Sequence, residues 1–202
     1  MNLLAHAHLS GNNNDILLGN FIADAVKGNK KLNYKTKIQQ GFALHHKIDE
    51  FTDDHPIVKQ SIERVKPHFS RFSGVVMDIY YDHYLARNWH DYDQRDLPVF
   101  AAHVYGILKR NVFILPFRTK RLLPFLISQN WLIAYADFTG LQHVFNGMDR
   151  KTGRISGMDH AVDVLKQNYD ELYDDFRLFY PELMEFARKE LNIITGGTNN
   201  TK

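Results

Sequence analysis

The chain has 202 residues, a formal net charge of +2 and no cysteine, which excludes disulfides, thiolate zinc sites and cysteine nucleophiles. No apolar run approaches the roughly 20 residues of a membrane span, and the first residues lack the basic and apolar regions of a signal peptide. We therefore expect one cytoplasmic protein that needs neither a membrane nor a nucleic acid as partner. The 11 histidines are the unusual feature of the composition.

The predicted secondary structure is helical throughout, because apolar residues recur at helical spacing and no segment alternates like a half-buried strand. Helices are expected over residues 15–28, 36–51, 56–68, 73–87, 97–110, 128–138, 139–148, 156–180 and 181–191. Asp15 is the expected N-cap of the first helix, and Asp53 or Asp54 that of the helix from residue 56. Pro116 and Pro124 are expected to delimit short pieces. The fold class is all-α, a single helical-bundle domain over residues 1–193 with a disordered tail over residues 194–202.

Three of these helices carry polar residues four positions apart on largely apolar faces. The pairs are Asn20 and Asp24, His45 and Asp49, and Asp78 and Asp82, with His83 directly after the last pair. Residues four apart project from the same side of a helix, and two carboxylates so placed destabilise it by about 0.2–0.5 kcal/mol. A cation is therefore expected between them: either an arginine such as Arg64, Arg71 or Arg87, or a divalent metal.

The N-terminal segment adds His6 and His8, which reach the same side if the segment is extended, or else hydrogen-bond to neighbouring helices. Imidazole and carboxylate ligands without thiolates suit Mn²⁺, Mg²⁺, Fe²⁺ or Zn²⁺, and a helical bundle can gather them from facing helices. Such a site is typical of water activation against a phosphate ester. The chain has no Glu-x-x-His pair, no glycine-rich nucleotide loop and no Gly-x-Ser-x-Gly elbow, which excludes several other enzyme classes.

Two basic segments lie between the predicted helices. Residues 27–37 contain five lysines, and Arg118, Lys120 and Arg121 form the second cluster. The simplest interpretation of each is a solvated surface. The alternative is a pair of surfaces that attract an acidic partner.

Several segments resemble bacterial acyl carrier protein phosphodiesterases, in the same order over nearly the whole chain. They are residues 1–9 (MNLLAHAHL), 19–24 (GNFIAD), 45–53 (HHKIDEFTD), 78–83 (DIYYDH), 129–132 (QNWL), 146–148 (NGM) and 179–181 (FYP). The family is similar to the HD-type metal phosphohydrolases in a non-standard form. The resemblance implies Mn²⁺-dependent hydrolysis, with Mg²⁺ or Fe²⁺ as alternatives, and a role in fatty acid metabolism. The implied substrate is holo acyl carrier protein, a small acidic helical protein, cleaved between its serine and 4′-phosphopantetheine.

The resemblance also implies a set of site residues. The expected metal ligands are Asp24, His45, Asp49, Asp78, Asp82 and His83. Asp82, His83, His46 and Lys47 are the expected catalytic residues, with His83 or His46 as proton donor, and Lys47, Asn20 and His6 are expected to contact the substrate. The order Asp82-His83 departs from the usual His-Asp, His46 and Lys47 stand where arginines are expected, and we interpret His90-Asp91 as lying outside the site.

Two alternatives remain open at this point. One is an HD-like phosphohydrolase that acts on nucleotides or another small phosphodiester, which predicts higher activity on free nucleotides than on a carrier protein. The other is a non-catalytic helical adaptor whose acidic residues form structural ion pairs. The adaptor would bind no metal, and Asp82→Ala would unfold it rather than only inactivate it.

Overall fold

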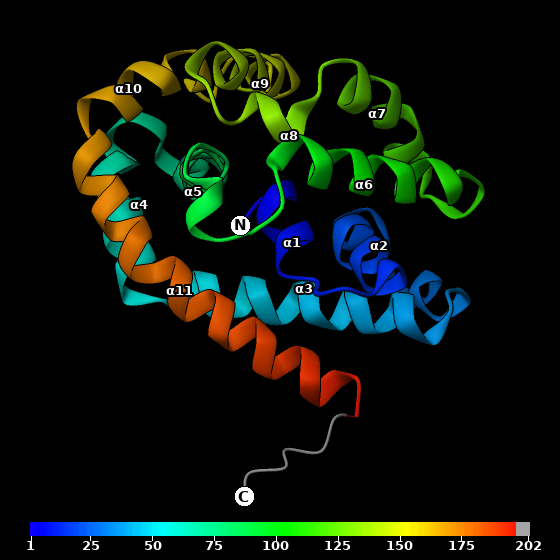
Figure 1. Cartoon of the computed structure of the whole chain (residues 1–202). Helices are drawn as coiled ribbons and strands as arrows, with labels where there is room; N and C mark the ends of the chain where they lie inside the picture. Colours follow the sequence, from blue (N-terminus) through cyan, green and yellow to red (C-terminus); the bar gives the residue numbers. More distant parts are fainter. Residues whose placement is uncertain (197–202) are drawn as a thin grey trace, which may run out of the picture.

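The computed structural model describes residues 1–196, in which all regular secondary structure is helical, so the all-α prediction is confirmed (Figure 1). The α-helices of this part of the chain are α1 Leu3–His8, α2 Asn14–Ile22, α3 Thr36–Asp54, α4 Pro56–Phe69, α5 Ser73–Arg87, α6 Leu97–Arg110, α7 Phe117–Ser128, α8 Trp131–Ala134, α9 Phe138–Lys151, α10 Ala161–Gln167 and α11 Tyr169–Ile194. The 3₁₀ helices η1 Ala23–Ala25, η2 Gly28–Asn33, η4 Trp89–Asp91 and η5 Val112–Ile114 connect several of them. None of the helices within residues 1–196 combines the length and apolarity that crossing a membrane requires.

The short helix α1 lies in the middle of the molecule and packs against both α2 and α5 (Figure 1). Four of its six residues are buried, His6 among them. The long helix α11 runs along α4 and across α3, and its buried aromatic residues pack against those of α5, as in the stacked pair Tyr81 and Phe179. The first 54 residues therefore form one side of the core, and α5 with α11 forms the other.

Helices α2 and α3 cross with their backbones in contact at two glycines. A Cβ atom on Gly41 would lie 2.2 Å from the carbonyl oxygen of Ile16, and one on Gly19 would lie 2.1 Å from that of Ile38. Separations below 3 Å leave no room for a methyl group, so only glycine permits this approach. The close crossing brings Asn20 of α2 beside His45 of α3.

The helix predicted over residues 15–28 was wrong at both ends. It begins after the N-cap Asn13, whose side chain accepts hydrogen bonds from the backbone N–H groups of Asp15 and Ile16. The α-helix ends at Ile22 and tightens into η1, so Asn20 and Asp24 do not share a regular helical face. Lysines 30 and 31, expected in a loop, lie in η2.

Two prolines lie inside helices that they were expected to end. Pro124 lies within α7 and Pro181 within α11, although an internal proline costs about 3 kcal/mol of helix stability. Phe179 and Leu183 are both fully buried on either side of Pro181, so packing of a continuous apolar face outweighs the lost hydrogen bond. The break falls instead at residue 168, between α10 and α11.

Other boundaries also shift. Helix α3 continues through Asp54, so His55 rather than an aspartate precedes α4. The helix expected over residues 128–138 is replaced by the end of α7 and the four-residue α8, whereas the helix expected over 139–148 is the longer α9. The domain limit at residue 193 stays a prediction, and residues 197–202 of the expected tail lie outside the described part of the chain.

Candidate metal centre

Two imidazoles and a carboxylate meet where α1, α2 and α3 come together. Ligand-capable atoms of His6, His45 and Asp49 all lie within 4.8 Å of one another. The two oxygens of Asp49 lie 3.1 Å from His6 Nε2 and 3.1 Å from His45 Nε2, and Asp24 Oδ1 lies 3.1 Å from His45 Nε2. The two rings stack with centroids 4.0 Å apart. The predicted pair His45 and Asp49 is thus joined by His6, which was expected only as a substrate contact.

Asn20 holds both imidazoles from the side opposite Asp49. Its Oδ1 accepts hydrogen bonds from His6 Nδ1 at 2.8 Å and His45 Nδ1 at 3.2 Å, while its Nδ2 donates to the His6 carbonyl and to Ser10 Oγ, both at 2.9 Å. An amide oxygen only accepts, so both Nδ1 atoms carry the hydrogen. With Nδ1 engaged in this way, the Nε2 atom of each ring is directed toward the Asp49 carboxylate. Such fixing of the free ring nitrogen by an outer group is typical of metal-binding histidines.

The electrostatics of this cluster fit a bound cation. Burial lowers the pKa of His6, so its ring is neutral, and the buried Nε2 has no well-formed hydrogen bond to any group within residues 1–196. Burial opposes protonation of His45, yet hydrogen bonds to Asp24 and Asp49 raise its pKa to about 9. The same imidazoles hold the pKa of Asp49 well below its usual range although burial opposes this. A divalent metal between these groups would satisfy the lone pair that His6 leaves unpaired, and the nitrogen and oxygen donors suit it.

The carboxylates of α5 have other partners. Asp82 is fully buried, and its oxygens accept the backbone N–H groups of Leu4 at 2.8 Å and Ala5 at 3.2 Å. Burial raises the pKa of Asp82 to about 7, against the effect of these two N–H groups. Asp78 contacts the Met1 ammonium at 2.9 Å. The structure thus does not bring Asp78 and Asp82 into the cluster, because the N-terminus of α1 takes the carboxylate of Asp82, whereas the His6 side chain of the same helix is directed toward α2 and α3.

His83 is buried on the far side of α5. Its Nδ1 lies 2.7 Å from the carbonyl oxygen of Tyr135 and its Nε2 lies 3.2 Å from the hydroxyl of Tyr169. Both ring nitrogens are therefore engaged away from the cluster, and neither the metal-ligand nor the proton-donor role expected for His83 fits this position.

His8 also points away from His6. Of the two alternatives for His6 and His8, the structure shows hydrogen bonds to neighbouring helices and not an extended segment, because residues 3–8 form α1 and positions two apart lie on different faces of a helix. His8 Nδ1 instead lies 2.8 Å from the hydroxyl of Tyr180.

The remaining predicted residues of α3 face solvent. His46 is exposed and contacts the Lys31 ammonium, and the Lys47 ammonium lies 2.8 Å from Glu50. Neither lines the cavity described below, since one and two positions beyond His45 the helix has turned away from it. His90 is exposed too and lies 3.8 Å from Asp96, outside the cluster.

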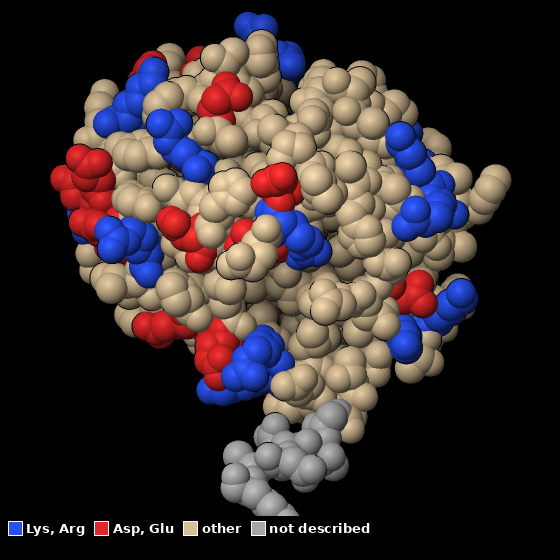
Figure 2. Space-filling model, viewed as in Figure 1, with Lys and Arg blue, Asp and Glu red and all other residues tan. Residues whose placement is uncertain are grey.

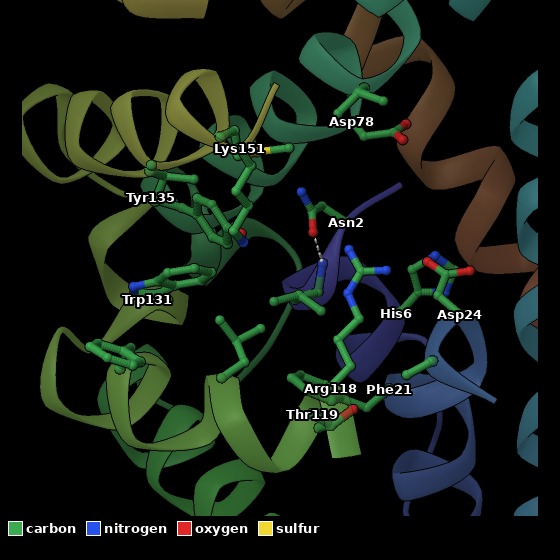
Figure 3. Close-up of a pocket in the computed structure, with 18 of the residues that line it drawn as sticks. Asn2, His6, Phe21, Asp24, Asp78, Arg118, Thr119, Trp131, Tyr135 and Lys151 are labelled. Carbon is green, nitrogen blue, oxygen red and sulfur yellow. Dashed lines mark hydrogen bonds between the residues drawn. The ribbon is translucent and has the colours of Figure 1, made fainter. Parts of the chain in front are cut away.

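A cavity of about 880 Å³ opens beside the cluster (Figure 3). His6, Asn20, Asp24 and His45 line its polar end. The opposite wall comes from α7, α8 and α9 and is mostly apolar, with Leu122, Phe125, Trp131, Tyr135, Val144, Met148, His143 and Lys151. The space is thus amphipathic, and it is large enough for a small-molecule ligand.

Arg118 reaches into this cavity from the first turn of α7. Figure 3 shows its guanidinium directed toward Asn2 and His6, at the polar end. Among residues 1–196 no carboxylate lies within ion-pair distance of Arg118. The sequence placed Arg118 only in a basic surface segment. Of the apolar wall it indicated only residues such as Trp131 and Met148, which fall in segments of the resemblance. No local pattern indicates that residue 118 lies beside residue 6.

Comparison with known proteins identifies the family of the chain. The profile of a family described as acyl carrier protein phosphodiesterase matches residues 1–183. A relative from Photorhabdus laumondii is 34% identical over 94% of this chain and 96% of its own, and one from Salmonella dublin is 33% identical over 95% and 100%. A third, from Yersinia pestis, is 32% identical over 93% and 98%, and all three are named acyl carrier protein phosphodiesterase. No solved structure matches the chain. Profile and relatives together show that the chain belongs to the acyl carrier protein phosphodiesterase family, a family of phosphodiester-cleaving hydrolases.

Proposed function

We propose that this protein hydrolyses the phosphodiester between 4′-phosphopantetheine and the serine of holo acyl carrier protein. Water adds to phosphorus, the bond from phosphorus to the serine oxygen breaks, and that oxygen takes up a proton. The products are apo acyl carrier protein and 4′-phosphopantetheine, which keeps the phosphate. The observation that carries the proposal is the His6, His45 and Asp49 cluster beside an amphipathic cavity of about 880 Å³. The names of the relatives supply the substrate.

The proposed metal ligands are His6 Nε2, His45 Nε2 and a carboxylate oxygen of Asp49, with Asp24 beside them. Mn²⁺ is the first choice, and Mg²⁺ and Fe²⁺ are compatible with the same donors. When bound, a divalent metal would polarise the phosphoryl oxygen and lower the pKa of a water molecule. Asp78, Asp82 and His83 are left out of the proposed ligand set because their polar atoms have other partners.

The residues of the cavity supply binding and orientation. Arg118 is proposed to hold the phosphate through paired N–H donors, the contact for which the sequence offered only Lys47. The apolar wall around Leu122, Phe125 and Trp131 is proposed to enclose the pantetheine arm and to keep bulk water from the phosphate. His143 is the cavity-lining imidazole outside the cluster, and it replaces His83 and His46 as the proposed proton donor to the serine oxygen.

The test is the intact mass of holo acyl carrier protein after incubation with this protein and Mn²⁺. Loss of the phosphopantetheine mass is expected, and it should disappear with a chelator and with His45→Ala. His90→Ala is the matched control, because His90 is exposed and outside the cavity. An unchanged mass, with metal bound and the protein folded, would contradict the substrate. Faster cleavage of a nucleotide or of bis(p-nitrophenyl) phosphate than of the carrier protein would favour the small-phosphodiester alternative.

A further inference from the structure

A continuous ridge borders the outer side of the cavity wall. It consists of η2 with Tyr34, of η5, and of the first turns of α7. The Tyr34 hydroxyl donates a hydrogen bond to the Ile114 carbonyl at 2.9 Å, and the Lys120 ammonium donates one to the Phe113 carbonyl, also at 2.9 Å. Segments about 80 residues apart in sequence are therefore fixed to one another as a single surface.

The ridge is strongly basic. Residues 28–34 and 112–121, which form it, contain five of the 25 Lys and Arg residues and none of the 23 Asp and Glu residues. The rest of the chain has 20 basic and 23 acidic residues, a formal charge of −3. Figure 2 shows two groups of Lys and Arg on the right of the molecule, the lower one with an acidic side chain beside it, while red and blue mix more evenly on the left. The small net charge of the whole chain is therefore compatible with a positive surface on one side of the molecule.

The same ridge exposes large apolar side chains. Phe113 is 89% exposed, Phe117 is 75% exposed and Leu32 is 70% exposed. The Arg121 guanidinium lies 5.8 Å from the centre of the Phe117 ring, so cations and aromatic rings alternate there. Exposed apolar groups rimmed by polar ones mark interaction sites, and aromatic side chains dominate the binding energy of such sites.

The ridge adjoins the cavity. Phe117 and Arg118 are neighbours on α7, yet Phe117 faces solvent while Arg118 lines the cavity. On the other side, the Asp24 side chain is 89% exposed, so the cluster opens to solvent just before the chain enters η2. A partner on the ridge would therefore reach the open edge of the cluster.

We infer that this ridge docks the acyl carrier protein itself, and the inference rests on the proposed function. The bond to be cleaved joins phosphorus to the carrier's own serine, so the carrier must touch the protein directly beside the cluster while its arm enters the cavity. An acidic partner matches the charge of the ridge, with Lys120 and Arg121 guiding the encounter and Phe113 and Phe117 making the apolar contact. Docking then determines which serine-linked phosphodiester reaches Arg118.

The experiment uses two double variants of the full-length protein, Phe113→Ser with Phe117→Ser, and Lys120→Glu with Arg121→Glu. Each should raise KM for holo carrier protein at least 10-fold while kcat and the Mn²⁺-dependent cleavage of bis(p-nitrophenyl) phosphate stay unchanged. The charge variant should also remove most of the salt dependence of kcat/KM. Leu178→Ser, at an apolar residue of α11 that is 63% exposed, is the matched control and should match the wild type.

Binding of fluorescein-labelled apo carrier protein, measured by anisotropy, separates the two proposals. Apo carrier has no phosphodiester, so its loss of binding in the ridge variants would support docking even if the wild type cleaved no holo carrier. If the wild type cleaves holo carrier protein and both variants keep its KM and its affinity for apo carrier, the docking role of the ridge is refuted and the proposed function stands. In the same anisotropy assay, unlabelled apo carrier should displace the labelled carrier. Displacement by a single-stranded oligonucleotide or by phosphatidylglycerol vesicles but not by unlabelled apo carrier would also overturn the ridge as a docking surface for the carrier.

Discussion

Asn20→Ala removes the side chain whose oxygen accepts hydrogen bonds from the Nδ1 atoms of both histidines of the cluster. Asn20 is fully buried and makes four hydrogen bonds, two to imidazole Nδ1 atoms, one to the His6 carbonyl and one to Ser10. At a net value of about 1 kcal/mol for each hydrogen bond, the free energy of unfolding should fall by about 3–4 kcal/mol. Loss of an outer-shell partner typically weakens metal binding by about 10–100-fold, and two ligands are affected here.

The assay for this change has two parts. Urea unfolding followed by circular dichroism gives the free energy of unfolding, and calorimetric titration with Mn²⁺ gives the affinity of the folded variant. Asn20→Asp keeps an acceptor for both Nδ1–H groups and should retain more affinity than Asn20→Ala. Asn14→Ala, at an exposed residue of the same helix, is the control and should change stability by less than about 0.5 kcal/mol. A folded Asn20→Ala protein that binds Mn²⁺ within threefold of wild type would refute the positioning role.

Four further predictions follow from the same geometry. Gly41→Ala should lower the free energy of unfolding by about 3 kcal/mol or more and weaken Mn²⁺ binding, because the added methyl group forces α2 away from α3. Gly74→Ala, whose added methyl group has no atom within 4 Å, should not lower the free energy of unfolding, and chemical unfolding compares the two variants. Burial lowers the pKa of His83 from 6.5 in the unfolded chain to about 4 in the folded protein. Between pH 6.5 and pH 4 the unfolded chain therefore binds a proton at His83 that the folded protein does not, and the free energy of unfolding falls as the pH drops through this range. His83 should account for about 2 kcal/mol of the loss between pH 7 and pH 5, and His83→Asn should remove that part of the slope in urea titrations. Mn²⁺ at 100 times its Kd should raise the free energy of unfolding by about 2.7 kcal/mol, and this increase should be absent in His45→Ala. Arg118→Lys should raise KM about 10-fold with unchanged Mn²⁺ affinity, because a lysine lacks the paired donors; an unchanged KM would argue against the phosphate contact.

Sequence patterns predicted the centre of the candidate site better than its surroundings. The i,i+4 pair His45 and Asp49 and the nearby Asn20 and Asp24 do come together, because each lies on or directly after a helix whose apolar spacing is clear. Asp82 illustrates the limit. Its position on an apolar stripe predicted a cation beside the buried carboxylate. The carboxylate instead accepts hydrogen bonds from two backbone N–H groups of α1.

Helix α1 itself explains that difference. Six residues are too few to form a stable helix by local propensity, so nothing in the sequence distinguishes it from an extended segment. It forms because the Asn2 side chain accepts a hydrogen bond from the Leu3 N–H, and Asp82 accepts those of the next two residues. The long-range contacts with Asp82 decide that His6 rather than Asp82 joins the cluster.

The fold class was predictable from periodicity, whereas several boundaries and the cavity were not. Pro181 is tolerated because the residues around it are buried by partners distant in sequence, and local propensity carries no information about them. Arg118 enters the cavity for the same reason, since its approach to His6 depends on how α7 packs over residues more than 100 positions away.

The two walls of the cavity come from separate stretches of the chain. The groups proposed to hold the metal lie within residues 6–49, and the wall proposed to receive the arm lies within residues 118–151. Mutations that reshape the second stretch can therefore alter which substrate is accepted while the reactive centre is inherited unchanged. Relatives with the same cluster and a different α7 would be expected to catalyse the same reaction on different substrates. Exchanging α7 between such relatives offers a direct way to change substrate specificity.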